Sequence, residues 1–275
     1  MLKNNYHTHM RFCNHAVGDV RDYCLAAIKA NLEELGMTDH APIPLDFMNE
    51  DDYRRTWSYE NMKLEQIDSY LAQINDSRLE FKDKLKIYSG FETEYLYGHD
   101  DYYHMLRRKV NYLNLGIHFF NDNNGKLYDT YSEVDYNSLE YYVKTIEDAL
   151  ETGLFNTLVH PDLFMYDYHN KDGKREFDDA AINATKKIIE ACIKNDIYVE
   201  INANGIKKDY DKDFMEFLYP YIDFWRIAKD YPELKIIVGV DAHDPKMLYG
   251  DHLKRIYELI DVVGVKVLDK MVIHH

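Results

Sequence analysis

Hydrophobic positions along the chain follow two alternating patterns. Short apolar runs are separated by longer stretches in which apolar residues recur at the three- to four-residue spacing of an amphipathic helix. The short runs, which predict strands, are residues 5–9, 35–38, 85–92, 112–118, 157–160, 197–202 and 235–241. The longer stretches, which predict helices, are residues 20–35, 59–75, 139–152, 180–195 and 212–219.

This alternation predicts a parallel sheet, because a helix between two strands returns the chain to the starting edge. Seven strands in one chain of this length fit a closed barrel better than an open sheet. Nearly every strand run also ends in His, Asp, Glu or Asn, and barrel enzymes build their sites from strand C-termini. An open doubly wound sheet would concentrate such residues at one crevice. Residues 262–268 could form an eighth strand, which the pattern does not decide.

Composition narrows the functional classes. The chain has 275 residues and 46% hydrophobic content, enough for one large core or at most two small ones. It contains no apolar run long enough for a membrane helix and no apolar N-terminal signal segment, so we expect a cytoplasmic protein without a membrane partner. The net charge of −16, without a Lys/Arg run, disfavours a nucleic-acid partner. Three cysteines without a CxxC pair indicate neither a disulfide framework nor a thiolate zinc site.

The strand ends carry a set of potential metal ligands. His7 and His9 lie two apart on one strand, so both side chains point to the same face. A single pair of this kind is more often structural than functional. The whole set, including one histidine on the first loop, comprises His7, His9, His15, His40, Glu92, His118, His160, Asp241 and His243. So many polar groups around one barrel mouth need partners, and imidazoles with a few carboxylates suit Zn, Fe or Mn better than Ca or Mg.

The ordered set of motifs resembles the PHP (polymerase and histidinol phosphatase) family, and within it the monofunctional bacterial histidinol-phosphate phosphatases. The resemblance covers roughly residues 4–245. It is carried by His7-Thr8-His9, by Arg11-Phe12-Cys13-Asn14-His15-Ala16, by Thr38-Asp39-His40-Ala41-Pro42, by Gly90-Phe91-Glu92, by Leu115-Gly116-Ile117-His118-Phe119, by His160-Pro161-Asp162-Leu163, by Glu200-Ile201-Asn202 and by Asp241-Ala242-His243.

The resemblance implies a fold and a metal site. The fold is a distorted TIM-like (β/α)7 barrel, which we take as one domain over residues 1–275, and the site holds two to three divalent transition-metal ions. Carried over by motif, the first ion takes His7, His9, Glu92 and Asp241; the second shares Glu92 as a bridge and takes His118 and His160; the third takes His15, His40 and His243.

The chain departs from the family where phosphate contacts are expected. Met10 stands where relatives commonly have Thr, and Ile206-Lys207-Lys208 stands where they commonly have Arg. Lysine keeps the charge but loses the bidentate geometry of arginine. The candidate substrate-binding residues are Arg11, Glu94, Asn202 and Lys207. Arg11 is either a phosphate clamp or part of a surface ion pair, and Glu94 either meets a substrate cation or is solvated.

Two further carboxylates, Asp162 and Glu200, are candidates to orient ligands from behind, and Asp162 or His243 could assist the leaving group. The predicted reaction is hydrolysis of a small phosphomonoester by a hydroxide that bridges two ions on either side of Glu92. L-histidinol phosphate, cleaved to L-histidinol and phosphate in histidine biosynthesis, is the first candidate substrate. The alternatives are a protein tyrosine phosphatase of the capsule-regulating kind, another small-molecule phosphatase, and a metal-binding module without catalysis.

Overall fold

The computed structural model describes residues 2–56, 58, 61–208 and 211–273. Within these residues the main sheet has seven strands, all parallel, in the order β1-β2-β3-β4-β7-β8-β9. The strands are β1 (Asn4–Asn5), β2 (Glu34–Met37), β3 (Lys86–Thr93), β4 (Tyr112–Leu115), β7 (Thr157–Leu158), β8 (Tyr198–Asn202) and β9 (Lys235–Gly239). Each strand lies within a run that the hydrophobic pattern predicts, apart from one-residue differences at the starts of β1 and β2 and at the end of β3.

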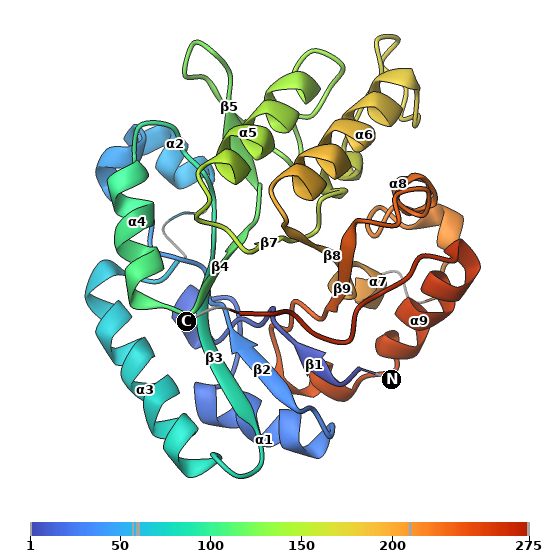
Figure 1. Cartoon of the computed structure of the whole chain (residues 1–275). Coiled ribbons are helices and arrows are strands. Elements are labelled where there is room, and N and C mark those ends of the chain that lie inside the picture. The colour runs from blue at the N-terminus through green and yellow to red at the C-terminus, as the bar shows by residue number, and fades with distance from the viewer. Residues whose placement is uncertain (1, 57, 59–60, 209–210, 274–275) are drawn as a thin grey trace.

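The sheet closes on itself beyond the ends of its first and last strands. Thr8 and Ala242 form a parallel bridge, and the backbone N–H of His9 donates to the carbonyl of Ala242 at 2.8 Å. The ring of strands with its helices outside is visible in Figure 1. The predicted distorted (β/α)7 barrel is thus confirmed, and closure occurs at the C-terminal ends of the strands, where the candidate ligands lie.

The helices surround the strands (Figure 1). They are α1 (Val20–Lys29), α3 (Ile67–Glu80), α4 (Asp100–Lys109), α5 (Leu139–Glu151), α6 (Asp179–Lys194), α8 (Ile222–Ala228) and α9 (His252–Val263). Sequence explains their bounds locally. Asp178, for example, caps α6 by accepting from the N–H groups of Ala180 and Ala181, and the apolar residues that recur along α6, such as Ile188 and Cys192, are fully buried.

Two small elements stand outside the βα repeat, near the C-terminal ends of the strands. The helix α2 (Glu50–Arg55) follows β2, and an antiparallel hairpin of β5 (Phe119–Asn121) and β6 (Leu127–Asp129) follows β4. A further short helix, α7 (Asn204–Lys208), follows β8 directly. The hydrophobic pattern predicts none of these, nor α4, α8 or α9.

Several predicted boundaries differ from the structure. The helix expected over 20–35 ends at Lys29, before β2 begins at Glu34. The stretch 212–219 contains a single 3-10 turn, Phe214–Glu216, instead of a helix, since the proline that follows Tyr219 disfavours helical geometry before it. The helix expected over 59–75 begins at Ile67, after a 3-10 turn at Leu64–Gln66; Tyr59 lies outside the described residues. Residues 262–268 begin as the end of α9, which stops at Gly264 in a left-handed conformation, and only Val267 then bridges to β9.

The end of the barrel away from the candidate ligands is filled by the segment after α9, which crosses the ring of strands in Figure 1. The N–H of Leu268 donates to the carbonyl of Ile236 at 2.7 Å, and the side-chain amide of Asn4 donates to the carbonyl of Asp269 at 2.8 Å. Met271 is then buried within the barrel in a cluster of apolar and aromatic side chains: Tyr6, Tyr88, Tyr112, Tyr198 and Ile237. This segment therefore completes the base of the barrel.

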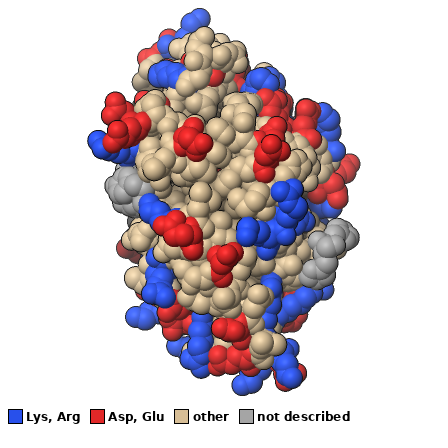
Figure 2. All heavy atoms as spheres, turned by 90° about the vertical axis from the view of Figure 1, so that its left-hand side faces the viewer, with Lys and Arg blue, Asp and Glu red and all other residues tan. Residues whose placement is uncertain are grey.

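The surface shows no concentration of one charge on the face drawn in Figure 2, where acidic and basic side chains are interspersed. None of the helices within the described residues combines the length and apolar character that crossing a membrane requires.

Candidate metal centre

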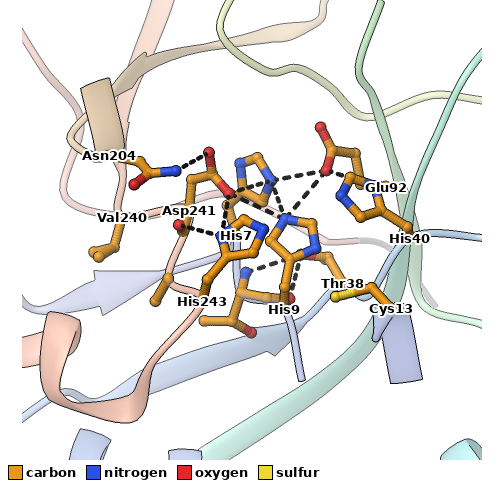
Figure 3. Close-up of polar contacts among 12 residues, drawn as sticks. His7, His9, Cys13, Thr38, His40, Glu92, Asn204, Val240, Asp241 and His243 are labelled. Carbon is orange, nitrogen blue, oxygen red and sulfur yellow. Dashed lines mark hydrogen bonds and ion pairs between the residues drawn. The ribbon is translucent and has the colours of Figure 1, made fainter. Parts of the chain in front are cut away.

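Glu92, in the second-last position of β3, lies at the centre of the side chains at the barrel mouth. Its Oε2 is 3.2 Å from Nε2 of both His7 and His9, and 3.3 Å from Nδ1 of His40. Its Oε1 is 2.9 Å from Nε2 of His160 and 3.6 Å from Nε2 of His118. One carboxylate thus faces five imidazoles from four segments of the chain, several of which are drawn in Figure 3.

Asp241, two residues after β9, provides a second carboxylate beside the first. Its Oδ1 is 3.0 Å from Nε2 of His9 and 3.5 Å from both Nε2 of His7 and Nδ1 of His243. His15 completes the set from the first loop, with ring centroids 5.3 Å from His40 and 5.0 Å from His243. The structure therefore brings all nine sequence-predicted ligands to one place.

Their ligand atoms form several overlapping groups, each compact enough for one ion. Four of the groups consist of predicted ligands alone: His7/His9/Asp241, His7/Glu92/His160, His40/Glu92/His118 and His9/His40/His243. A fifth joins His9 to Cys13 and Asp39. Glu92 belongs to two of them, as expected of a bridge between ions. None of the three predicted sets recurs as one group. His7, His9 and Asp241 group without Glu92, and His118 and His160 join Glu92 in separate groups. His9 rather than His15 joins His40 and His243.

Two carboxylates behind the imidazoles determine which ring nitrogen faces the centre. Nδ1 of His7 is 2.8 Å from Glu200, and Nδ1 of His118 is 2.6 Å from Glu94. An ionised carboxylate only accepts, so each ring carries its proton on Nδ1 and directs the lone pair of Nε2 inward. This arrangement is typical of metal-binding histidines. The prediction that Glu200 orients a ligand agrees with this contact.

The electrostatics of the cluster favour positive charge at its centre. Burial opposes ionisation of Glu92, but the neighbouring His7, His40 and His118 hold the pKa of Glu92 well below its usual range. Conversely, burial disfavours charged His9, yet hydrogen bonds to Asp241 and Glu92 raise the pKa of His9 to about 9. Two ionised carboxylates that face converging ring nitrogens create a negative electrostatic potential. A divalent cation neutralises this potential better than protons do.

Other members are held neutral. Burial and the charge of His9 lower the pKa of His40 well below its ordinary value and that of His243 to about 3. A neutral imidazole is the form that binds a metal, and it has no proton to donate at neutral pH beyond its bound N–H. These shifts favour His243 as a ligand over its alternative role as a proton donor to the leaving group.

The backbone around the carboxylates is adapted to them. A Cβ on Gly116 would lie 2.3 Å from Oε1 of Glu92, and a Cβ on Gly239 would lie 1.9 Å from Oε2 of Glu200. His160 and Asp241 adopt positive φ angles of 33° and 49°, a region that costs side-chain-bearing residues energy. Glycine makes room for two carboxylates, and strained backbone directs two ligands inward. The residues therefore fit a multinuclear site for transition metals.

A cavity of about 650 Å³ opens above the cluster. Its floor includes the carboxylates Glu92 and Asp241, and its walls come from loops and from the β5–β6 hairpin. The wall residues that sequence reasoning missed are Thr56, Asn61, Phe119, Asp129, Tyr131, Tyr166, Asn204 and Tyr219. Apart from Phe119, which ends the motif around His118, none lies in a strand-end motif. The 25 Tyr of the chain are the one signal that could have indicated the tyrosines among them, but composition alone does not place them.

The four predicted substrate-binding residues have different surroundings. Arg11 pairs with Asp19 on the surface, with 60% of its side chain exposed. Lys207 is exposed and its Nζ contacts the sulfur of Met247 at 3.3 Å. Neither lines the described part of the cavity. For Arg11, the ion-pair interpretation is the one that the structure supports, and the phosphate clamp is not.

Glu94 and Asn202 are buried polar residues of the site, with specific partners. Glu94 lines the cavity but already binds the ring of His118 and, through Oε2, its backbone N–H at 2.9 Å. Asn202 donates to Glu200 at 2.7 Å and to Asp241 at 3.3 Å. Both side chains hold the carboxylates and rings in place. Glu94 is therefore not solvated, and it is committed to a histidine instead of a substrate cation.

Asp162 is turned away from the cavity. Its Oδ2 accepts from the indole N–H of Trp225 at 2.9 Å and from the backbone N–H of Tyr221, and burial raises its pKa to about 6. It does not line the described part of the cavity. The structure therefore contradicts its predicted contact with the leaving group. Its position is explained by packing of the loop after β7 against α8.

Comparison with known proteins agrees with this geometry. A Deinococcus radiodurans protein named "Probable histidinol-phosphatase" is 27% identical over 266 residues, covering 94% of this chain and 93% of that protein. Histidinol-phosphatase of Bacillus subtilis is 23% identical over 269 residues, covering 88% and 94%.

Two solved structures share the fold. A Listeria monocytogenes protein provisionally described as a histidinol phosphatase superposes with a TM-score of 0.73 at 18% identity, covering 92% of this chain and 99% of that one. Histidinol phosphate phosphatase of Lactococcus lactis, solved with zinc, L-histidinol and phosphate, gives a TM-score of 0.69 at 19% identity, covering 98% and 96%.

The PHP domain family itself matches residues 5–204, which include seven of the nine predicted ligands. The remaining two, Asp241 and His243, reach the same mouth from the end of β9. On the strength of this match, which spans well over half of its length, the chain belongs to the PHP domain family.

Proposed function

We propose that this protein is a metal-dependent phosphomonoesterase whose substrate is L-histidinol phosphate, cleaved to L-histidinol and phosphate in histidine biosynthesis. The observation that carries the proposal is the cluster of imidazoles around Glu92 and Asp241 at the floor of a cavity of about 650 Å³. That cavity is the right size for a small molecule. The relatives named histidinol phosphatases, and the zinc, histidinol and phosphate bound in the Lactococcus lactis structure, support this substrate.

Two to three divalent ions, Zn, Fe or Mn, are the proposed cofactors, held by the nine ligands. Bound there, such ions lower the pKa of a coordinated water to about 7 and neutralise charge that develops on the phosphoryl group. The chain's own contribution is to fix the rings of two ligands, His118 through Glu94 and His7 through Glu200. We further propose that residues 1–275 act as one cytoplasmic domain with a small-molecule partner and without a nucleic acid or membrane.

The cavity wall offers neutral donors to the phosphoryl oxygens. Asn61 and Asn204 carry amides, and Tyr131, Tyr166 and Tyr219 carry hydroxyls, while no Lys or Arg lines the described part of the cavity. The ions would therefore supply most of the positive charge that the phosphate dianion requires. This assignment replaces the contacts expected from Arg11 and Lys207.

A protein tyrosine phosphatase remains the second candidate activity, and the cavity distinguishes the two. A phosphotyrosine within a protein needs an open approach, whereas the half-buried aromatic wall above His118 suits a small leaving group. Tyr131 stacks against His118 with ring centroids 6.0 Å apart and an interplanar angle of 11°.

The test is steady-state kinetics of metal-loaded protein on L-histidinol phosphate, phosphotyrosine and p-nitrophenyl phosphate. Histidinol leaves poorly, so its turnover depends on binding energy used for orientation. We expect kcat/KM for L-histidinol phosphate to exceed the others by at least about a hundredfold, or about 2.7 kcal/mol. The Glu92→Gln variant, purified in parallel, is the control for contaminating phosphatase activity in the preparation. Equal kcat/KM values on all three substrates would rule out histidinol phosphate as the specific substrate. Absence of activity on all three would rule out the proposed phosphatase activity.

A further inference from the structure

One carboxylate in the cavity wall has no role in holding the metal ligands. We propose that Asp129 binds a positively charged group on the leaving alcohol, and thereby makes the site selective for cationic phosphomonoesters. The inference rests on the proposed phosphatase function and assigns a specificity residue to it. For L-histidinol phosphate the group in question is the ammonium beside the phosphate ester.

Asp129 differs from the other carboxylates that line the described part of the cavity. Glu92 and Asp241 lie among the imidazoles, and Glu94 is bound to His118 at 2.6 Å. Asp129, the last residue of β6, forms none of the ion pairs found among the described residues, and its Oδ1 accepts a hydrogen bond from the backbone N–H of Tyr131 at 2.8 Å. Its second oxygen is therefore available to a ligand in the cavity.

The surroundings of Asp129 favour a cationic partner. The carboxylate is half-buried, and a charge withdrawn from water gains most from a charged hydrogen-bonding partner. No Lys or Arg of the described lining competes for it. The rings of Tyr131 and Tyr166 meet edge to face beside it, with centroids 5.1 Å apart. Aromatic faces of this kind attract cations and pack against flat heterocycles.

The hairpin holds Asp129 in a fixed position before any ligand binds. Its backbone N–H donates to Glu133 at 2.7 Å, and Glu133 in turn pairs with Arg55. Arg55, the last residue of α2, also donates to the carbonyl of Leu127 at 2.6 Å. Arg55 thus ties α2 to both sides of the hairpin strand that bears Asp129. A carboxylate positioned in advance loses little entropy when it binds a ligand.

Two substrates that differ in one group provide the test. L-histidinol phosphate carries the ammonium, and 3-(imidazol-4-yl)propyl phosphate lacks it but keeps the imidazole and the phosphate ester. Asp129→Asn preserves the shape of the side chain and an oxygen that can accept from Tyr131. We expect it to lower kcat/KM for L-histidinol phosphate about ten- to hundredfold, and that for the deaminated compound by less than about twofold. Asp76→Asn, on the exposed face of α3, is the matched control and should change neither value.

Binding of L-histidinol gives a readout independent of turnover. Titration calorimetry on metal-loaded protein should show about tenfold weaker binding of L-histidinol to Asp129→Asn than to wild type, with unchanged binding of inorganic phosphate. Equal losses on both substrates, or an unchanged affinity for L-histidinol, would overturn the role of Asp129. If wild type hydrolysed neither substrate, the proposed function would fail, while the calorimetric comparison would still decide whether Asp129 recognises the cation.

Discussion

The floor and the wall of the cavity are built in different ways. The floor consists mainly of side chains at strand ends, of which His7, His9, Glu92, His160 and Asp241 are buried. The ring nitrogens that face Glu92 and Asp241 lie 2.9–3.6 Å from their carboxylate oxygens. The wall comes from the β5–β6 hairpin and from loops, and its tyrosines and Asp129 line the cavity. The floor has one arrangement that suits metal ions, whereas the wall can vary without disturbing the barrel. We therefore assign the chemistry to the floor and the choice of substrate to the wall.

The largest effect should come from the centre of the floor. Glu92→Gln removes a charge that faces five imidazoles, so we expect loss of at least one bound metal and a drop in kcat of at least about a hundredfold. Elemental analysis and single-substrate kinetics measure both. His40→Ala is the companion variant and should lose less metal. Normal metal content and turnover in Glu92→Gln would contradict the bridging role.

A smaller effect is expected one layer behind the ligands. Glu200→Gln weakens the hydrogen bond that fixes the ring of His7, so metal affinity should fall about ten- to hundredfold. Competition with a chelator measures this affinity. Asp162→Asn is the control, because that carboxylate is equally buried but binds Trp225 instead of a ligand. Asp162→Asn should lower the free energy of unfolding by about 1–3 kcal/mol, measured with denaturant, and leave metal affinity unchanged. If both variants lost metal equally, the loss would be a general effect of destabilisation.

Loosening the wall should change substrate use without changing the metal. Arg55→Gln removes the ion pair with Glu133 that supports the hairpin, so we expect KM for L-histidinol phosphate to rise severalfold while turnover of p-nitrophenyl phosphate stays the same. The cost in stability should be no more than about 1 kcal/mol, since this pair is partly exposed. A loss of metal in this variant would show that the wall and the floor are not separable.

The smallest effect is expected at Arg11. Its guanidinium is on the surface with Asp19, so Arg11→Ala should alter kcat/KM by less than about twofold and stability by less than about 0.5 kcal/mol. Kinetics and denaturant unfolding check both values. A tenfold fall in kcat/KM would instead support the interpretation of Arg11 as a phosphate contact, which its position close to His7 and His9 in the sequence suggested.

The same division explains what the sequence could predict. His7, His118 and Asp241 lie in or at the ends of apolar runs that predict barrel strands, so their convergence follows from the predicted topology. The hairpin that carries Asp129 has two three-residue strands inside a polar segment, a pattern too short to distinguish from a loop. Spacing left open whether Glu94 faces the pocket, and it cannot show that His118, which follows another strand, binds Glu94 instead of a substrate. The phosphate contact predicted for Arg11 is unsupported for the same reason: the path of the following loop brings Asp19 next to Arg11, and spacing does not predict that path.

The way the ring is closed also bears on the order in which the chain folds. The contact of His9 with Ala242, and that of Asn4 with Asp269, join segments from opposite ends of the sequence, with 265 positions between the members of the second pair. Contacts between residues so far apart in the sequence are expected to form late in folding, because closing a long loop has a large entropic cost. The neighbouring pairs β2–β3 and β8–β9 can assemble early. His7 and His9 therefore meet Asp241 only in the final step, so the complete set of ligands should appear together with the fully folded barrel, and partly folded chains should bind metal weakly.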